Sequence, residues 1–75
     1  MPRFYFHIED GETVCDREGQ FFLDIEDARQ AALRSAREML AAGSLDGGDR
    51  IVIADENGNA IMAVPLAEAA RATQH

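Results

Sequence analysis

The stretch Ile51-Val52-Ile53-Ala54-Asp55-Glu56-Asn57-Gly58-Asn59-Ala60-Ile61-Met62-Ala63-Val64 decides the fold. Two apolar runs of strand length flank a short polar segment that contains Asn57-Gly58, a dipeptide typical of tight hairpin turns. We therefore predict that Ile51–Ala54 and Ala60–Val64 form an antiparallel hairpin. Both strands are apolar at successive positions, so both faces of this hairpin need to be covered.

A helix is predicted upstream of this hairpin, from Ile25 to about Ala42. Asp24 is a typical N-cap, acidic residues follow in the first turn, and Gly43 suits the position just past the C-terminal end. Apolar side chains recur at steps of three and four residues, which gives the helix one apolar face. The residues on that face are Ala28, Ala32, Leu33, Ala36, Met39 and Leu40. A single helix of this kind covers one face of a sheet.

The N-terminal part of the chain predicts a second hairpin. Residues 3–8 alternate between large apolar and more polar side chains, Glu9-Asp10-Gly11 is a turn, and Glu12–Asp16 is the partner strand. In the register that we favour, Phe6 faces Val14 and Tyr5 faces Cys15, which puts His7 diagonal to Cys15 on the same face. The apolar segment 20–23 either extends the sheet or fills the edge of the core, and the pattern leaves both possibilities open.

The predicted element order is ββαββ(α). It describes an α+β domain with an antiparallel sheet of about four strands, one long helix on one face, and a short C-terminal helix at Leu66–Ala72 that has Pro65 in its first turn. We expect one domain over residues 1–75, with 72–75 as a disordered tail. The predicted core contains Phe6, Ile8, Ala32, Ala36, Leu40 and Ile53.

The second face of the sheet constrains assembly, because the long helix covers only one side. Either the C-terminal helix or a second copy of the chain is available to cover the other side. The C-terminal helix is about two turns of mostly alanine and shields little area. We therefore expect a homodimer.

Charge and composition exclude several classes of function. The chain has 14 acidic and 7 basic residues, a net charge of −7, and no lysine. Schiff-base chemistry, phosphate-binding loops with a lysine, and lysine general bases are therefore excluded. No apolar run approaches the roughly 18 residues of a membrane span, and the single Cys15 has no disulfide partner in the chain. We expect a cytoplasmic protein with no membrane association and no cofactor.

Candidate site residues are few. His7 and Cys15 are the pair that hints at nucleophilic or metal chemistry, and Tyr5 lies on the same predicted face, so these three residues form a candidate ligand-binding site. Two ligands fall short of the three or four that zinc requires. The segment that starts at Asp55 begins like a calcium loop, but Ala60 and Leu66 occupy the positions of its glycine and its bidentate acid. We predict no metal site and no catalytic residue.

Several short motifs resemble a known family. They are the opening Met1-Pro2-Arg3-Phe4-Tyr5-Phe6-His7, the pairs Asp10-Gly11 and Glu18-Gly19, the helix opened by Asp24, Asp55-Glu56-x-Gly58, and Val64-Pro65. Together they resemble a family of short bacterial proteins that is a domain of unknown function. The resemblance implies a stand-alone cytoplasmic domain and brings no activity, cofactor or catalytic residue.

Two hypotheses for the function follow. The first is a non-enzymatic, homo-oligomeric interaction module with a regulatory role, which meets another protein through a sheet face or through its acidic surface. The second is a small-ligand-binding protein or minor enzyme that uses the face with Tyr5, His7 and Cys15. The second hypothesis needs a concave pocket, which a thin domain rarely provides by itself.

The charge distribution predicts that the domain does not bind nucleic acid. The seven arginines are dispersed along a chain of net charge −7, so no basic stripe opposes the repulsion between the protein and the phosphate backbone. Titration with duplex DNA or RNA at low salt should show no binding tighter than about 1 μM. Tighter binding under these conditions would contradict the charge argument.

Overall fold

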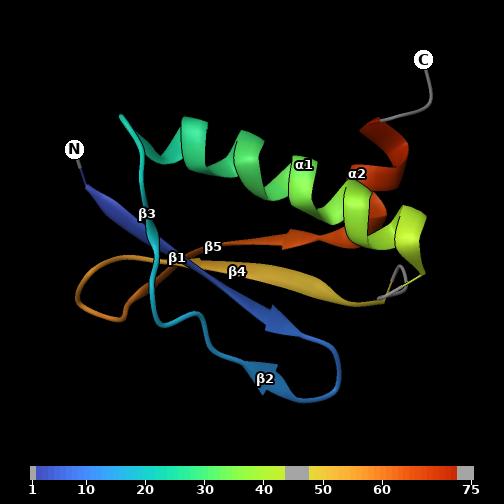
Figure 1. Cartoon of the computed structure of the whole chain (residues 1–75), viewed down its shortest axis with the longest axis horizontal. Coiled ribbons are helices and arrows are strands. Elements are labelled where there is room, and N and C mark those ends of the chain that lie inside the picture. Colours follow the sequence, from blue (N-terminus) through green and yellow to red (C-terminus); the bar gives the residue numbers. More distant parts are fainter. Residues whose placement is uncertain (1, 44–47, 73–75) are drawn as a thin grey trace.

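The computed structural model describes residues 2–43 and 48–72, which form five strands and two helices. Figure 1 shows their arrangement. The elements in chain order are β1 (Arg3–Glu9), β2 (Thr13–Val14), β3 (Gln20–Phe21), α1 (Ile25–Ala42), β4 (Arg50–Ala54), β5 (Ala60–Pro65) and α2 (Leu66–Ala72). The architecture is α+β, as predicted.

Local signals set the limits of α1. The Asp24 carboxylate accepts a hydrogen bond of 3.0 Å from the Asp27 N–H, which satisfies one of the donors that a helix N-terminus leaves unpaired. Gly43 ends the helix with a φ of 74° and donates its N–H to the Leu40 carbonyl. The predicted helix from Ile25 to Ala42 is confirmed at both ends.

The sheet is antiparallel and has the order β2-β1-β4-β5, with β3 also paired to β1. The N-terminal strand is therefore central, and β5 is an edge strand. The second hairpin is confirmed, and its turn holds Gly58 at a φ of 84° while the Asp55 carboxylate accepts the N–H groups of Asn57 and Asn59. Pro65 ends β5 instead of lying in the first turn of the following helix as predicted.

The favoured register of the first hairpin was wrong by two residues. Ile8 pairs with Val14 and Glu9 pairs with Thr13, so the three-residue loop is Asp10-Gly11-Glu12. This register places two apolar side chains opposite each other, whereas the predicted register paired Ile8 with the charged Glu12. The partner strand is also shorter than predicted, since only Thr13–Val14 pairs with β1.

The apolar segment 20–23 does both of the things that its sequence left open, because different residues extend the sheet and fill the core edge. Gln20 and Phe21 pair with β1, and the Phe22 N–H donates to the Pro2 carbonyl beyond the end of this ladder. The Phe22 ring packs against the core, 5.8 Å from the Phe6 ring centroid to centroid. The segment therefore both extends the sheet and fills the core edge.

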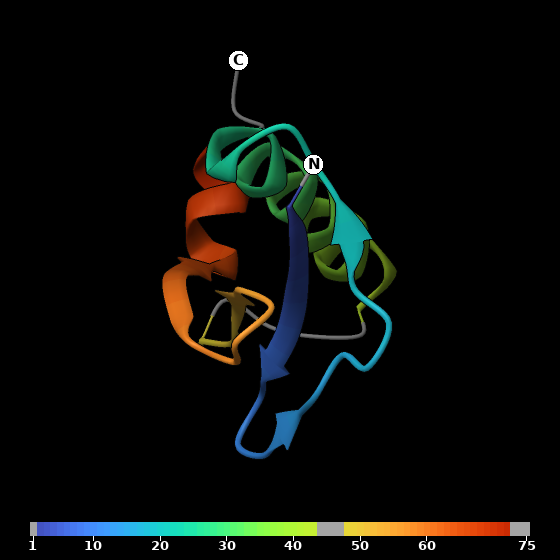
Figure 2. The ribbon, with the colours of Figure 1, turned by 90° about the vertical axis from the view of Figure 1, so that its left-hand side faces the viewer.

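Both helices lie on the same face of the sheet. Figures 1 and 2 show α2 beside α1 above the strands, and within the described part of the chain no helix lies on the opposite side. Arg29 of α1 and Glu68 of α2 form an ion pair of 2.5 Å, and the start of α2 is tied to the sheet by the Leu66 N–H, which donates to the Asp49 carbonyl. Of the two predicted covers for the second face, the C-terminal helix is thereby excluded.

The core lies between the helices and the sheet. Its buried members include Ala32, Ala36 and Ile53, and Phe6 and Leu40 pack against it, as predicted. Ile8 was wrongly placed in this core, because β1 runs away from the helices toward its C-terminal end and leaves Ile8 half-buried (Figure 1). Leu66 and Ala69 of α2 join the core with no exposed surface.

Neither described helix is long and apolar enough to cross a membrane. The predicted disordered tail at 72–75 lies outside the described residues, except for Ala72 at the end of α2.

The burial of Leu66 predicts that α2 is part of the folding unit. Leu66→Ala should lower the free energy of unfolding by about 2–5 kcal/mol, because it removes a fully buried side chain and leaves a cavity. Leu23→Ala is the matched control, since Leu23 is 72% exposed and its loss should cost less than about 0.5 kcal/mol. Denaturant unfolding measures both. Equal stability of the two variants would contradict the position of α2.

Candidate functional site

The face of the sheet opposite the helices is the candidate site, and we call it the open face. Cross-strand register places its side chains in three rows, because directly opposed residues point to the same side. The rows are Tyr5, Ala54 and Ala60; then His7, Val52 and Ala63; then Glu9, Arg50 and Pro65. The middle of the face is therefore small and apolar, and its aromatic and charged groups lie toward β1 and one end.

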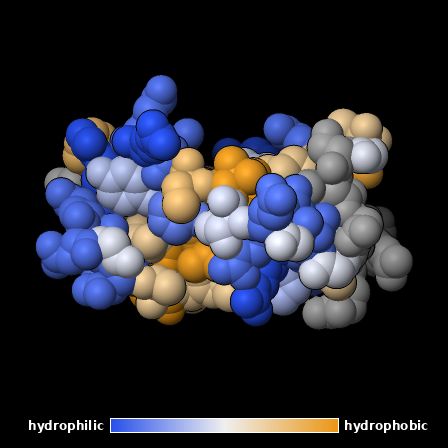
Figure 3. All heavy atoms as spheres, turned by 90° about the horizontal axis from the view of Figure 1, so that it is seen from below, coloured by the Kyte–Doolittle hydropathy of each residue, from blue (hydrophilic) through white to orange (hydrophobic). Residues whose placement is uncertain are grey.

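The surface view from the sheet side shows this distribution (Figure 3). Apolar residues lie near the middle of the open face, with hydrophilic residues among and around them. Ile61 is 45% exposed, although it is one of the large apolar residues of the chain. Exposed apolar residues that lie near one another mark interaction sites more often than scattered single residues do.

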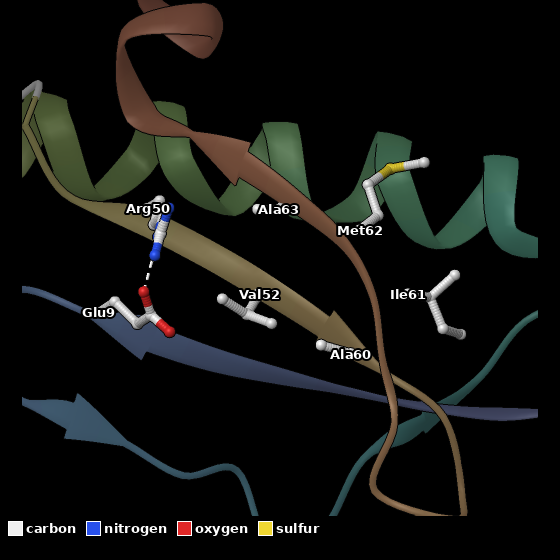
Figure 4. A pocket seen from close by; sticks show the side chains of 7 residues that line it. All are labelled: Glu9, Arg50, Val52, Ala60, Ile61, Met62 and Ala63. Atoms are coloured by element: carbon white, nitrogen blue, oxygen red, sulfur yellow. Dashed lines mark hydrogen bonds and ion pairs between the residues drawn. The ribbon is translucent and has the colours of Figure 1, made fainter.

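A shallow depression of about 320 Å³ lies over β4 and β5 (Figure 4). Val52, Ala60, Ile61, Met62 and Ala63 line most of it, and at one end Glu9 and Arg50 form an ion pair of 2.6 Å. The depression is open to solvent along its length and offers one paired set of charges. It suits a surface contact better than an enclosed small ligand.

Asp16 joins the segment between β2 and β3 to the middle of β1. Its carboxylate accepts the Phe6 N–H at 3.2 Å, and its own N–H donates to His7 Nδ1 at 3.0 Å. The same carboxylate accepts the N–H groups of Glu18 and Gly19 at 3.0 and 3.3 Å. Neither β2 nor β3 pairs with Phe6 in the middle of β1. The Asp16 carboxylate accepts the Phe6 N–H there instead of a strand carbonyl.

The environment of Asp16 favours its ionised form. Burial alone would raise the pKa of the carboxyl, but the N–H groups of Glu18, Phe6 and Gly19 outweigh it and hold the pKa below its usual value. A charged His7 would lower this pKa further. A charged imidazole has no lone pair at Nδ1 to accept the Asp16 N–H, so we attribute the lowering mainly to the three backbone donors.

Position 19 needs a glycine, because the backbone has a positive φ and no room is left for a Cβ atom. Its φ is 69°, and a Cβ atom at this position would lie 2.9 Å from side-chain atoms of both Arg3 and Tyr5. The segment after Asp16 therefore packs closely over the first residues of β1.

The three predicted site residues are only partly brought together. Tyr5 and His7 are half-buried on the open face, as the alternation predicts, whereas Cys15 is exposed in the segment between β2 and β3. No hydrogen bond joins Cys15 to His7 among the described residues, and none of the three lines the depression over β4 and β5. With His7 Nδ1 occupied by the Asp16 N–H, only Nε2 remains to meet a ligand.

Sequence reasoning missed Asp16 and Ile61. Asp16 was assigned to a strand, although the spacing of Asp16 and Gly19 matches an acid that caps its own turn with a glycine at positive φ. Ile61 was assigned to a strand without regard to exposure. Within residues 2–43 and 48–72, no three side chains of His, Cys, Asp or Glu lie close enough together to hold a metal ion.

The fold and the open face define a small α+β domain whose sheet is covered by helices on one side only. The chain belongs to the DUF6894 family, described as a domain of unknown function, whose model matches residues 3–67. No curated protein and no solved structure gives a match.

The hydrogen bonds of Asp16 predict a pH-dependent contribution to stability. Asp16→Asn should lower the free energy of unfolding by about 1–2 kcal/mol at pH 7, because it replaces a charged acceptor with an amide. The folded pKa is below the unfolded value near 3.8, so this contribution is complete above the unfolded pKa and is lost as the pH falls through the folded pKa.

The difference between wild type and Asp16→Asn should therefore be constant above about pH 5 and shrink at lower pH. Chemical denaturation at several pH values measures it. Glu12→Gln removes one exposed acidic charge nearby and should show little difference from wild type at any of these pH values. A difference for Asp16→Asn that stays constant down to pH 2 would contradict this account.

Proposed function

We propose that this chain is a small non-enzymatic interaction module that self-associates and meets another protein through the open face of its sheet. One observation carries the proposal. Both helices lie on the same side of the sheet, and the opposite side keeps an apolar centre in contact with solvent (Figures 2 and 3). Burial of apolar surface is worth about 25 cal/mol per Å², so each 100 Å² of this face that another protein covers contributes about 2.5 kcal/mol.

The distribution of charge supports self-association at this part of the chain. The whole chain has a net charge of −7, but Glu9 is the only acidic residue in β1, β4 and β5, and it is paired with Arg50. The other acids among the described residues lie in helices, turns and loops. Two copies can therefore meet along these strands without bringing unpaired like charges together, whereas contact through the helices or turns would oppose acid to acid.

The exposed Ile61 provides a test of self-association. Wild type should show a mass that rises from 8.2 kDa toward twice that value as its concentration increases. Ile61→Glu should weaken this association at least about tenfold, or about 1.4 kcal/mol, because it adds a charge to each copy on β5, one of the strands along which the copies meet. Sedimentation equilibrium measures both proteins.

Leu23→Glu is the matched control. Leu23 is also a large apolar residue, it is 72% exposed, and it follows β3, which pairs with β1 and is separated from β5 by β1 and β4. This variant should associate as wild type does. A wild-type mass of 8.2 kDa at every concentration up to 1 mM would refute self-association, and equal weakening by both variants would show that the effect is one of net charge alone.

A further inference from the structure

The two edges of the sheet differ in how well they are protected. On the β1 side, two strands of two residues each are separated by the Asp16 segment, and charged residues surround them. On the other side, β5 is a six-residue edge strand without a charged residue. Figure 2 shows no described element beyond β5 on that side. Natural edge strands are usually blunted by charge, proline, β-bulges, shortness or cover. β5 ends in Pro65 and has a register shift next to Ala60, but residues 62–64 between them include no charge, proline or bulge.

The register shows which backbone groups of β5 point outward. The Leu66 N–H donates to the Asp49 carbonyl, so these two residues form a hydrogen-bonded pair that continues the β4–β5 register by one step. Hydrogen-bonded and non-hydrogen-bonded pairs alternate along an antiparallel ladder. Arg50 with Pro65 is therefore non-hydrogen-bonded, and so is Val52 with Ala63. The N–H and C=O groups of Ala63 consequently point away from β4, toward the open edge.

Pro65 agrees with this geometry. Proline has no N–H to donate, and in sheets it is found on edge strands where the missing N–H would have faced solvent. Its position in a non-hydrogen-bonded pair with Arg50 places the missing donor on the outer side of β5. Ala63, two residues earlier, is exposed and retains both of its outward backbone groups.

We propose that β5 pairs with β5 of a second copy, antiparallel and side by side, with Ala63 opposite Ala63 of that copy. This inference rests on the proposed self-association and specifies how the two copies meet. An antiparallel two-fold pair lets each Ala63 N–H donate to the other Ala63 carbonyl. The five strands of each copy then form one continuous sheet. All helices lie on one side of it, and the two open faces lie side by side on the other, where they remain accessible to another protein.

Charge favours a second copy as the occupant of this edge. β5 contains no charged residue in a chain of net charge −7, so self-pairing puts uncharged side chains opposite uncharged side chains. The small Ala63 side chain at the two-fold axis offers no steric obstacle. Pairing through one strand edge buries less than the roughly 800 Å² per partner of a standard interface, so the dimer is reversible and its formation depends on concentration.

Substitution of Ala63 shows whether self-association depends on the backbone N–H of this residue or on its side chain. Ala63→Pro removes the outward N–H, which the β4–β5 ladder does not use, so the fold should be retained while self-association weakens at least about tenfold. Ala63→Ser keeps the N–H and should associate as wild type does. Sedimentation equilibrium and circular dichroism measure association and fold. A folded Ala63→Pro variant that associates like wild type would overturn the pairing.

Amide hydrogen exchange on the wild-type chain tests the same contact without a substitution. The Ala63 amide should exchange at least about tenfold more slowly at 1 mM than at 20 μM, while the Val64 amide, which faces β4, should be protected at both concentrations. This measurement decides the question if Ala63→Pro does not fold. Exchange at Ala63 that is independent of concentration in a chain that dimerises would refute the β5 pairing alone. A chain that stays monomeric at 1 mM would refute the self-association on which the pairing rests.

Discussion

Leu66 begins α2 where β5 ends, and its buried side chain and its N–H bond to Asp49 hold that helix on the side of the sheet that α1 already covers. The rest of the structure depends on this placement. Among the described residues, the segment after Asp16 reaches only the first residues of β1 on the opposite face, and no helix covers the rest of that face. The domain consequently has one thin core, between the helices and the sheet, and one apolar face that only another molecule can bury.

Asp16 and β5 give the two edges of the sheet opposite properties. The Asp16 carboxylate supplies an acceptor to β1 where β2 and β3 leave a gap, so that edge is closed by a side chain and is unsuited to pairing with another strand. The other edge ends in β5, whose central backbone groups point outward from an uncharged strand. The edge beside β1 is closed by residues of the same chain, and the edge at β5 can pair with a strand of a second copy.

Much of this fold follows from local signals in the sequence. Asp24 and Gly43 mark the ends of α1, and Asn57-Gly58 marks the second hairpin, because each acts within a few residues of itself. The register of the first hairpin could not be predicted in the same way, since Asp10-Gly11 fits both a turn at 9–11 and the observed loop at 10–12. The alternation of side chains along β1 predicted that Tyr5 and His7 share a face. The hydrogen bond from the Phe6 N–H to the Asp16 carboxylate joins residues ten positions apart, and no periodic pattern in the sequence predicts it. The side of the sheet that α2 takes also depends on tertiary packing, because an alanine-rich helix can pack on either face.

The most direct test of this account is the set of nuclear Overhauser contacts that α2 makes in solution. We expect contacts from the methyl groups of Leu66 and Ala69 to the apolar side of α1, and none to Val52 or the Tyr5 ring on the open face. Contacts from α2 to Val52 or Tyr5 would place the helix over the open face and contradict the account.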